Sequence, residues 1–253
     1  MRPKIIFITG TDTGVGKTVL TGLLLSYLRQ NGYRALAIKP FCSGDRADAE
    51  LLCDLQDDEL SLDEINPFYF KEPLAPLVAA RLHAQEIPLA VALASIHIAL
   101  ANLKTKHSKL KTPPVLLIEG VGGLLAPLGE SEFKVQSSRF KVQGSFYTAL
   151  DLIQALPARV IVVAPNRLGA INHTLLSLHT LQVAGIKPLK AVLMDHLSRN
   201  TQPATRTNPA ILSELLASVP LVRLPYLGKN PASPRVLKSF ARKLKITLAQ
   251  ILP

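Results

Sequence analysis

Short, continuously apolar runs separated by helical stretches constrain the fold of this chain most strongly. A half-exposed strand alternates apolar and polar residues, whereas these runs do not, which indicates strands buried on both faces. Buried strands that alternate with helices indicate a parallel sheet. We therefore predict a doubly wound α/β fold, with a mostly parallel sheet and helices on both faces. The predicted strands are residues 4–9, 34–38, 115–118, 160–163, 190–194 and, at an edge, 221–224; the helices include 17–30, 172–184 and 209–217.

No change of composition along the chain marks a domain boundary. The 253 residues, 48% of them hydrophobic, are enough for one sizeable core. We expect one domain over residues 1–253, with loops at 57–76 and 104–114. The tetrapeptide Phe-Lys-Val-Gln at 133–136 recurs at 140–143, and so short a repeat predicts a surface hairpin or extended loop.

A glycine-rich turn joins the first predicted strand to the first predicted helix, and it reads Gly10-Thr-Asp-Thr-Gly-Val-Gly-Lys-Thr18. Gly14 and Gly16 allow backbone N–H groups to face phosphate oxygens, and the helix N-terminus adds partial positive charge. Lys17 can reach the β and γ phosphates, and Thr18 can offer its hydroxyl to Mg²⁺. The pattern is a variant P-loop, because its first glycine is residue 10 and not residue 11, and it predicts an ATP site.

Two further groups follow predicted strands and should reach the same site, because ligands of such sheets bind at the carboxyl ends of the strands. Lys39 follows the second strand, and two lysines at one phosphate site suit phosphoryl transfer to an anionic acceptor. Glu119 follows the strand 115–118, where a carboxylate commonly holds Mg²⁺. Asp48, near the start of a predicted helix, is either a third oxygen ligand or a charge at a helix N-terminus.

Composition and charge narrow the class of protein. No apolar run approaches the roughly 20 residues of a membrane span. Cys42 and Cys53 lack metal-ligand spacing, and we expect reduced thiols in a cytoplasmic protein. The net charge of +11 suits either nucleic acid or a solvated surface that attracts anions, but aromatic residues are only 5% and form no base-stacking platform. We expect no nucleic-acid and no membrane partner. The denser basic stretches are Lys104, Lys106, Lys109 and Lys111 in a predicted loop, and Arg235, Lys238, Arg242, Lys243 and Lys245 on a predicted terminal helix.

The motifs, taken together and in order, resemble those of the dethiobiotin synthetase family. The matching segments run from residue 5 to about residue 230. They are Gly10 to Thr18, Lys39-Pro-Phe-Cys-Ser-Gly44, Asp48, Glu119-Gly-Val-Gly-Gly123, Leu168-Gly-Ala-Ile-Asn-His173 and Pro225-Tyr-Leu227.

This resemblance implies a P-loop cyclo-ligase that uses 7,8-diaminononanoate, CO₂ and ATP with Mg²⁺. One amine would take up CO₂ as a carbamate, ATP would phosphorylate the carbamate, and the second amine would close the ring on the mixed anhydride. The products would be dethiobiotin, ADP and phosphate. The family works as a homodimer, so the substrate site would lie at a subunit interface.

The resemblance also implies a role for each matching residue. Lys39 and Lys17 would be catalytic, and Thr18, Asp48 and Glu119 would hold Mg²⁺. The substrate would meet Ser43 and, from the partner subunit's copy, the helix start formed by Ala170, Ile171 and Asn172, where an anion suits the N-terminus. The ATP contacts would be Thr13, Gly14, Val15, Gly16, Lys17, Thr18, Val19, Asp48, Glu119, Gly120, Val121, Gly122, Met194, Asp195, Pro225, Tyr226 and Leu227.

The chain departs from the family pattern in three places. Met194 replaces the usual asparagine, and a thioether cannot form an amide's paired hydrogen bonds to a base, so other nucleoside triphosphates become candidates. Residues 73–77 read Pro-Leu-Ala-Pro-Leu and lack the usual serine and histidine, and Ala232 replaces a common acidic ATP contact.

Two other functions of P-loop proteins fit this chain less well. An amide ligase of the cobyrinate type normally adds a glutaminase domain, for which this chain is about 100 residues too short. An ATP-driven switch of the partitioning type carries a signature lysine where this chain has Asp12.

Overall fold

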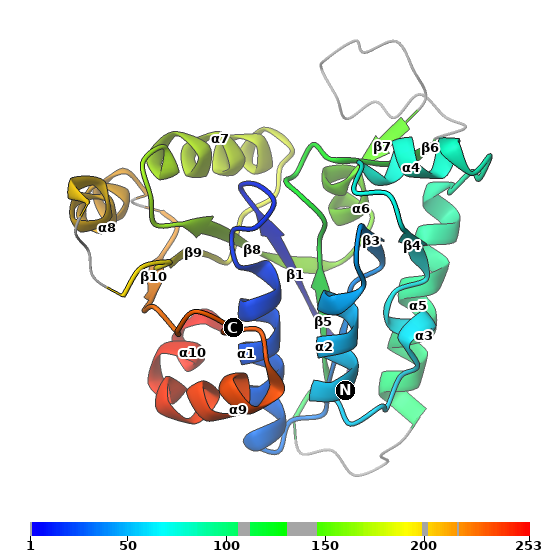
Figure 1. Cartoon of the computed structure of the whole chain (residues 1–253), viewed down its shortest axis with the longest axis horizontal. Coiled ribbons are helices and arrows are strands. Elements are labelled where there is room, and N and C mark those ends of the chain that lie inside the picture. Colours follow the sequence, from blue (N-terminus) through cyan, green and yellow to red (C-terminus); the bar gives the residue numbers. More distant parts are fainter. Residues whose placement is uncertain (1, 106–111, 131–145, 199–201, 217) are drawn as a thin grey trace.

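A six-stranded parallel sheet forms the centre of the computed structural model, which describes all residues except 1, 106–111, 131–145, 199–201 and 217. The strand order is β10-β9-β8-β1-β5-β2, and every neighbouring pair is parallel (Figure 1). The strands are β1 (Lys4–Gly10), β2 (Ala35–Ile38), β5 (Val115–Glu119), β8 (Ala158–Pro165), β9 (Lys190–Met194) and β10 (Leu221–Leu224). The predicted strands, including the edge strand, are confirmed.

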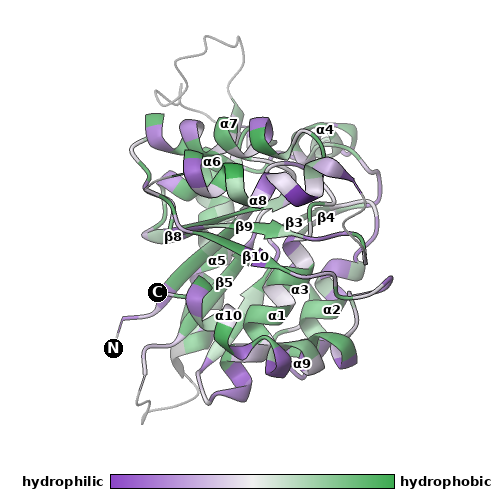
Figure 2. Cartoon of the chain, turned by 90° about the vertical axis from the view of Figure 1, so that its left-hand side faces the viewer, coloured by the Kyte–Doolittle hydropathy of each residue, from purple (hydrophilic) through white to green (hydrophobic). Residues whose placement is uncertain are grey.

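Helices cover both faces of this sheet. Figure 2 shows α6 (Ala149–Gln154) and α7 (Ala170–Val183) on one side of the strands, and α1 (Lys17–Gln30), α9 (Pro234–Lys243) and α10 (Lys245–Ile251) on the other. Helix α5 (Leu89–Thr105) packs on β2 and β5, and α8 (Pro203–Leu215) packs on β10. The doubly wound α/β prediction is therefore confirmed.

Burial follows from the apolar runs. Every residue of β2 and β5 is buried, as are Ile5 to Gly10 of β1. One contiguous apolar cluster extends from Ile5 to Ile251. Strands buried on both faces need helices on each side to remove them from water, and the sequence supplies those helices between the strands.

The segment 57–76, which we expected to be a loop, contains regular structure. It includes α3 (Leu62–Ile65), whose N-terminus has a capping box between Ser61 and Glu64, and β4 (Phe68–Phe70). Strand β4 pairs with β3 (Phe41–Ser43) in a small parallel sheet that packs against α4 (Pro76–Leu82), while α3 packs against α2 (Ala47–Leu55). The prediction failed because elements of three and four residues are too short to show a period.

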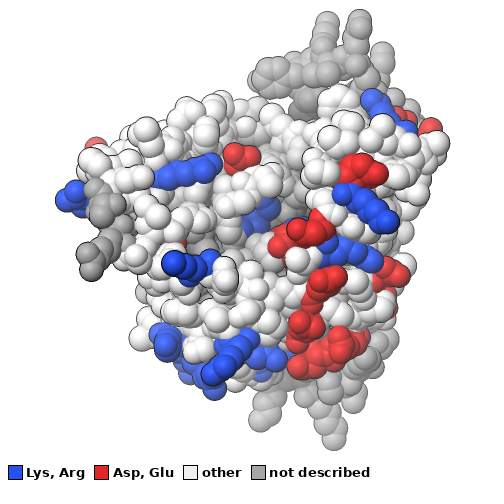
Figure 3. All heavy atoms as spheres, in the orientation of Figure 1, with Lys and Arg blue, Asp and Glu red and all other residues white. Residues whose placement is uncertain are grey.

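Two helix predictions also need correction. Helix α8 begins at Pro203 instead of residue 209: Pro203 takes the first-turn position that suits proline, and Pro209 lies inside the helix. The predicted terminal helix is two helices that meet at Leu244, whose backbone leaves the helical region (φ −98°, ψ 19°). Its basic residues lie on the surface at the lower left of Figure 3, beside acidic residues over α2.

A second small sheet pairs β6 (Pro127–Glu130) with β7 (Phe146–Thr148) in antiparallel fashion. The repeated tetrapeptides at 133–136 and 140–143 fall between these strands and lie outside the described residues. The expected loop at 104–114 also lies largely outside them, apart from the end of α5.

Candidate functional site

The turn between β1 and α1 is held by backbone contacts that glycine makes possible. Gly14 and Gly16 have φ of +70° and +101°, in the left-handed region that favours glycine. A Cβ on Gly10 would lie 2.7 Å from Val15 Cγ2 and 3.1 Å from Lys17 Nζ. Thr11 N donates to Val163 O at 2.9 Å, which fixes the turn to β8. The turn therefore has the shape of a phosphate-binding loop.

Lys17 lies at the start of α1 and is only 6% exposed. Its Nζ donates to the backbone oxygens of Asp12 at 2.8 Å and Gly122 at 3.0 Å. Burial lowers the pKa of Lys17 to about 8, even though the carboxylate of Glu119 opposes that shift. The structure thus brings the P-loop lysine and the turn after β5 together, as expected for strands that end at one edge.

Lys39, Asp48, Glu119 and Thr18 form one cluster. Lys39 Nζ contacts Asp48 Oδ2 and donates to Glu119 Oε1 at 2.9 Å, and Thr18 Oγ1 donates to that same Oε1 at 2.6 Å. Burial alone would lower the pKa of Lys39, but the carboxylates of Glu119 and Asp48 outweigh it and raise that pKa above its ordinary value. Lys39 is therefore a fixed, buried cation.

Glu119 leaves one oxygen free in this cluster. Its side chain is fully buried, and Oε2 has no hydrogen-bond partner. A buried carboxylate oxygen without a partner is costly, and two carboxylates with a hydroxyl match the oxygen ligands that Mg²⁺ prefers. Within the described ranges, no group of three or more His, Cys, Asp or Glu side chains could hold a metal. A cation held here would thus need oxygens from a ligand or water as well, which is usual for Mg²⁺.

The glycines after β5 bring that turn against the P-loop. Gly120 N donates to Ile8 O at 2.9 Å, and a Cβ on Gly120 would lie 2.9 Å from Phe7 Cε1. A Cβ on Gly123 would lie 3.4 Å from Gly10 O. Gly122 has φ of +57°, and Thr13 Oγ1 lies 3.9 Å from where its Cβ would be. The two turns are therefore neighbours, with Val121 half-buried between these glycines.

A pocket of about 280 Å³ lies beside Gly16 of the P-loop. It is lined by residues from α1 and from the segments after β9 and β10. Of the predicted ATP contacts it contains Gly16, Val19, Met194, Asp195, Tyr226 and Leu227. Sequence reasoning missed His196, Gly228, Lys229 and Pro231, although they adjoin residues that it named. Pro225 is not among the lining residues.

The predicted substrate contacts occupy two separate places. Ser43 ends β3, and its buried hydroxyl has no hydrogen-bond partner, so it could accept one from a ligand. Ala170 to Asn172 form the first turn of α7, after Gly169 with φ of +89°. Asn172 is exposed, and the contacts of the described residues do not bring this turn into the lysine cluster.

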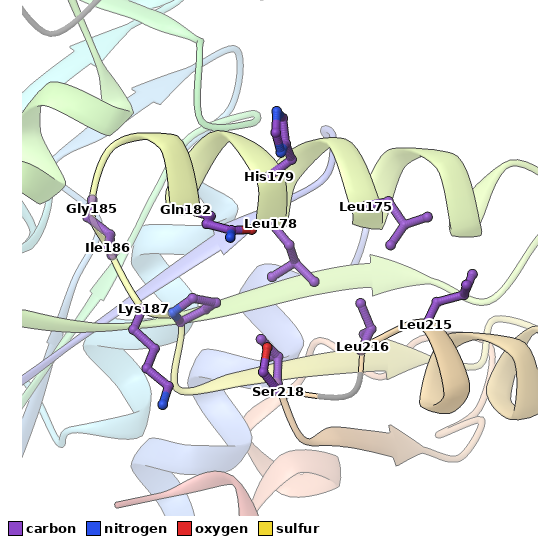
Figure 4. A pocket seen from close by; sticks show the side chains of 12 residues that line it. Leu175, Leu178, His179, Gln182, Gly185, Ile186, Lys187, Leu215, Leu216 and Ser218 are labelled. Carbon is purple, nitrogen blue, oxygen red and sulfur yellow. The ribbon is translucent and has the colours of Figure 1, made fainter.

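A second hollow lies away from this site. It measures about 590 Å³ and lies at the opposite edge of the sheet, between the second half of α7 and the end of α8. Figure 4 shows leucines from both helices facing it, and His179 and Lys187 also belong to its lining. Unlike this mainly apolar hollow, a recess in the middle of the face drawn in Figure 3 has basic and acidic groups on its walls.

Comparisons with known proteins agree with this geometry. A family model described as an AAA domain matches residues 4–232. The ATP-dependent dethiobiotin synthetase of Bacillus subtilis (strain 168) is 32% identical over 237 residues, covering 92% of this chain and 89% of that protein. The enzyme of the same name from Thermodesulfovibrio yellowstonii is 34% identical over 253 residues, covering 96% and 98%.

Two solved structures share the fold at low sequence identity. A plasmid partition protein from Borrelia burgdorferi B31, bound to AMPPNP, has a TM-score of 0.55 at 11% identity, covering 99% of this chain and 98% of that chain. The septum site-determining protein MinD from Pyrococcus horikoshii OT3, in complex with Mg-ADP, has a TM-score of 0.52 at 16% identity, covering 99% and 94%. At 11% and 16% identity these similarities concern the architecture alone. The two synthetases are 32% and 34% identical over nearly the whole chain, so the chain belongs to the family of ATP-dependent dethiobiotin synthetases.

Proposed function

We propose that this chain forms dethiobiotin, ADP and phosphate from 7,8-diaminononanoate, CO₂ and ATP, as a cyclo-ligase acting in biotin biosynthesis. The observation that carries the proposal is the pair of buried lysines, Lys17 and Lys39, around Glu119 at the end of β5. A site that only binds a nucleotide needs one such lysine, while a second buried cation suits transfer to an anionic acceptor. The names of the two synthetases agree with this reading.

ATP would bind with its phosphates on the P-loop. Backbone N–H groups around Gly14 and Gly16 and the N-terminus of α1 favour anions, and Lys17 would exchange its two carbonyl partners for phosphate oxygens. The nucleoside would occupy the 280 Å³ pocket beside Gly16. The other proposed contacts remain Thr13, Val15, Thr18, Val19, Asp48, Glu119, Gly120, Val121, Gly122, Met194, Asp195, Pro225, Tyr226 and Leu227.

Mg²⁺ would be held by Thr18, Asp48 and Glu119. The free Oε2 of Glu119 and the hydroxyl of Thr18 supply the oxygen ligands that this ion prefers. When bound, the ion would neutralise phosphate charge. In the structure, Lys39 holds Asp48 and Glu119 together and so keeps the carboxylates close to Thr18.

The reaction would proceed in three steps that this constellation can support. One amine of the substrate attacks CO₂ and loses a proton, which gives a carbamate anion. A carbamate oxygen then attacks the γ phosphorus of ATP and ADP leaves, while Lys39 stabilises the charge on the carbamate and on the transferred group. The second amine attacks the carbonyl carbon, phosphate leaves, and the ring closes. Ser43, whose hydroxyl is unpaired and buried, would position the diamine.

We also propose that the chain acts as a homodimer in the cytoplasm, folded as one domain. The helix start at Ala170, Ile171 and Asn172 lies apart from the lysine cluster, so it would meet the substrate carboxylate of a partner subunit's site. Leu168 beside it is 84% exposed, which suits an interface. Both cysteines are free thiols, as is usual in the cytoplasm. No helix in the described part of the chain is long and apolar enough to span a bilayer.

The decisive experiment supplies the purified protein with 7,8-diaminononanoate, bicarbonate and MgATP. Mass spectrometry should detect dethiobiotin, with one ADP formed for each ring closed. ATP binding without any dethiobiotin over a wide range of diamine concentrations would show that the assignment is wrong. ATP hydrolysis stimulated by DNA or membranes, and not by the diamine, would favour a switch ATPase instead.

A further inference from the structure

Polar side chains join the carboxyl ends of β8, β9 and β10, which lie side by side at one end of the sheet in Figure 1. Asn166 follows β8, Asp195 follows β9, and Arg223 lies in β10. Asn166 Nδ2 donates to Asp195 Oδ1 at 2.7 Å. Arg223 donates to Asp195 Oδ2 from Nε at 2.9 Å and from Nη2 at 2.7 Å. Both oxygens of the Asp195 carboxylate are therefore engaged, and its side chain is only 9% exposed.

Asn166 fixes this group to the rest of the fold. It is buried, and its backbone N donates to Met194 O at 2.7 Å. Its Nδ2 also donates to Thr205 O at 2.9 Å, and its Oδ1 accepts from Asn208 Nδ2 at 3.1 Å. Thr205 and Asn208 belong to α8. A buried amide with all these partners has little freedom to move, so the Asp195 carboxylate is held from one side by a rigid support.

Asp195 and its two chain neighbours, Met194 and His196, together form a wall of the proposed nucleoside pocket. Met194 Cε lies 3.1 Å from where a Cβ on Gly16 would be, so this wall contacts the P-loop. Any shift of Asp195 therefore moves the pocket wall relative to the phosphate loop. Arg223 is not among the pocket's lining residues, and its side chain is 40% exposed at the edge strand.

We propose that Arg223 is a positioning residue for the nucleoside pocket, and that it acts through Asp195. Arg223 and Asn166 engage both carboxylate oxygens of Asp195, which fixes Asp195 and, with it, its neighbours Met194 and His196 in the pocket wall. The inference rests on the proposed function only in that the pocket holds the nucleoside of ATP. Without Arg223, a mostly buried carboxylate loses its cation and gains by turning toward water, which would pull the wall away.

The test distinguishes the binding of the nucleoside from the binding of the phosphates. We would measure the dissociation constants of MgATP and of Mg-tripolyphosphate by calorimetry for Arg223→Gln, with Arg159→Gln, an exposed arginine on β8, as the matched control. We expect Arg223→Gln to weaken ATP binding roughly tenfold, or about 1.4 kcal/mol, and to leave tripolyphosphate binding within twofold. The Arg159 variant should bind both ligands as the parent protein does.

A rescue variant distinguishes positioning from a loss of stability. In Arg223→Lys, an ammonium group can still pair with the Asp195 carboxylate, so part of the ATP affinity that is lost in Arg223→Gln should return. Equally weakened binding of both ligands, unchanged binding of both, or no recovery in Arg223→Lys would overturn the proposal. These measurements use no diamine, so a failure of ring closure in the parent protein would not affect their interpretation.

Discussion

Lys39 and Thr18 share a single oxygen of Glu119: Lys39 Nζ lies 2.9 Å and Thr18 Oγ1 lies 2.6 Å from Oε1. Thr18 comes from the phosphate loop and Lys39 from the end of β2, so one buried carboxylate joins the proposed ATP site to the proposed acceptor site.

Lys39→Met should abolish most ring closure while ATP still binds. The variant removes the cation that stabilises the charge of the transferred group, and the loss of one such group costs roughly 10²–10³-fold in rate. Dethiobiotin formation at saturating ATP and diamine measures the effect, and calorimetry checks that ATP binds. The matched control is Lys71→Met, an exposed lysine. Near-normal turnover in Lys39→Met would show that this lysine is not catalytic.

The same variant should bind Mg²⁺ more tightly in the absence of nucleotide. Lys39 neutralises Asp48 and Glu119, so its removal leaves two close carboxylates without a cation. We expect affinity for Mn²⁺, used as a paramagnetic substitute, to rise roughly tenfold in a spin-resonance titration. An affinity equal to that of the parent protein would mean that Lys39 and the metal do not compete for these oxygens.

ATP binding should take up a proton that belongs to Lys17. Burial lowers the pKa of Lys17 to about 8 in the free protein, so this side chain is mostly neutral at pH 9 and mostly charged at pH 7. Phosphate oxygens favour the charged form and would raise that pKa again. The number of protons taken up per ATP bound should therefore increase from pH 7 to pH 9. Calorimetry in buffers of different ionisation enthalpy measures this number. Lys17→Met should lose the pH-dependent uptake, and the same uptake in that variant would assign the proton to another group.

Gly16→Ala should impair ATP binding beyond the backbone strain that it introduces. The matched control is Gly185→Ala, because both positions have positive φ (+101° and +75°) and alanine there costs about 1 kcal/mol. Only the Gly16 variant places its Cβ 3.1 Å from Met194 Cε, while nothing lies within 4 Å of the other Cβ. Thermal unfolding should show similar losses of stability, and calorimetry should show a loss of ATP affinity in Gly16→Ala alone. Equal affinities in the two variants would contradict this role of the contact.

Met194→Asn should increase the selectivity of the protein for the nucleobase of its triphosphate. Met194 lines the proposed nucleoside pocket, and its thioether offers a base only a weak acceptor. An amide can donate and accept, so we expect the preference for ATP over GTP and CTP to rise roughly tenfold, as one good hydrogen-bond pair would allow. Met194→Leu keeps the apolar side chain and serves as the control. The same base preference in both variants would show that residue 194 does not read the base.

The sequence was sufficient for the sheet and for the lysine cluster. Each strand of the six-stranded sheet is mostly apolar, and such runs need no long-range information to be found. Lys39 and Glu119 each follow a strand directly, so the rule that carboxyl ends of parallel strands meet at one edge brought them together.

The remaining features depend on contacts between distant parts of the chain. Asn166, Asp195 and Arg223 meet because β8, β9 and β10 are neighbours, and no local pattern gives that order in advance. Strands β3 and β4 are three residues each and exist because they pair with one another. Local propensity is a weak guide where pairing supplies the stability.

The central position of β1 has a consequence for synthesis on the ribosome. The first strand to emerge pairs with β5 and β8, whose residues follow it by more than a hundred positions, and the turn after it is tied to Val163. A nascent chain that stops before residue 158 therefore carries the entire phosphate-loop motif without β8, one of the two strands that pair with β1. Such a fragment should gain no protection from protease when MgATP is added, whereas the full chain should, because loop and strand acquire their shape together.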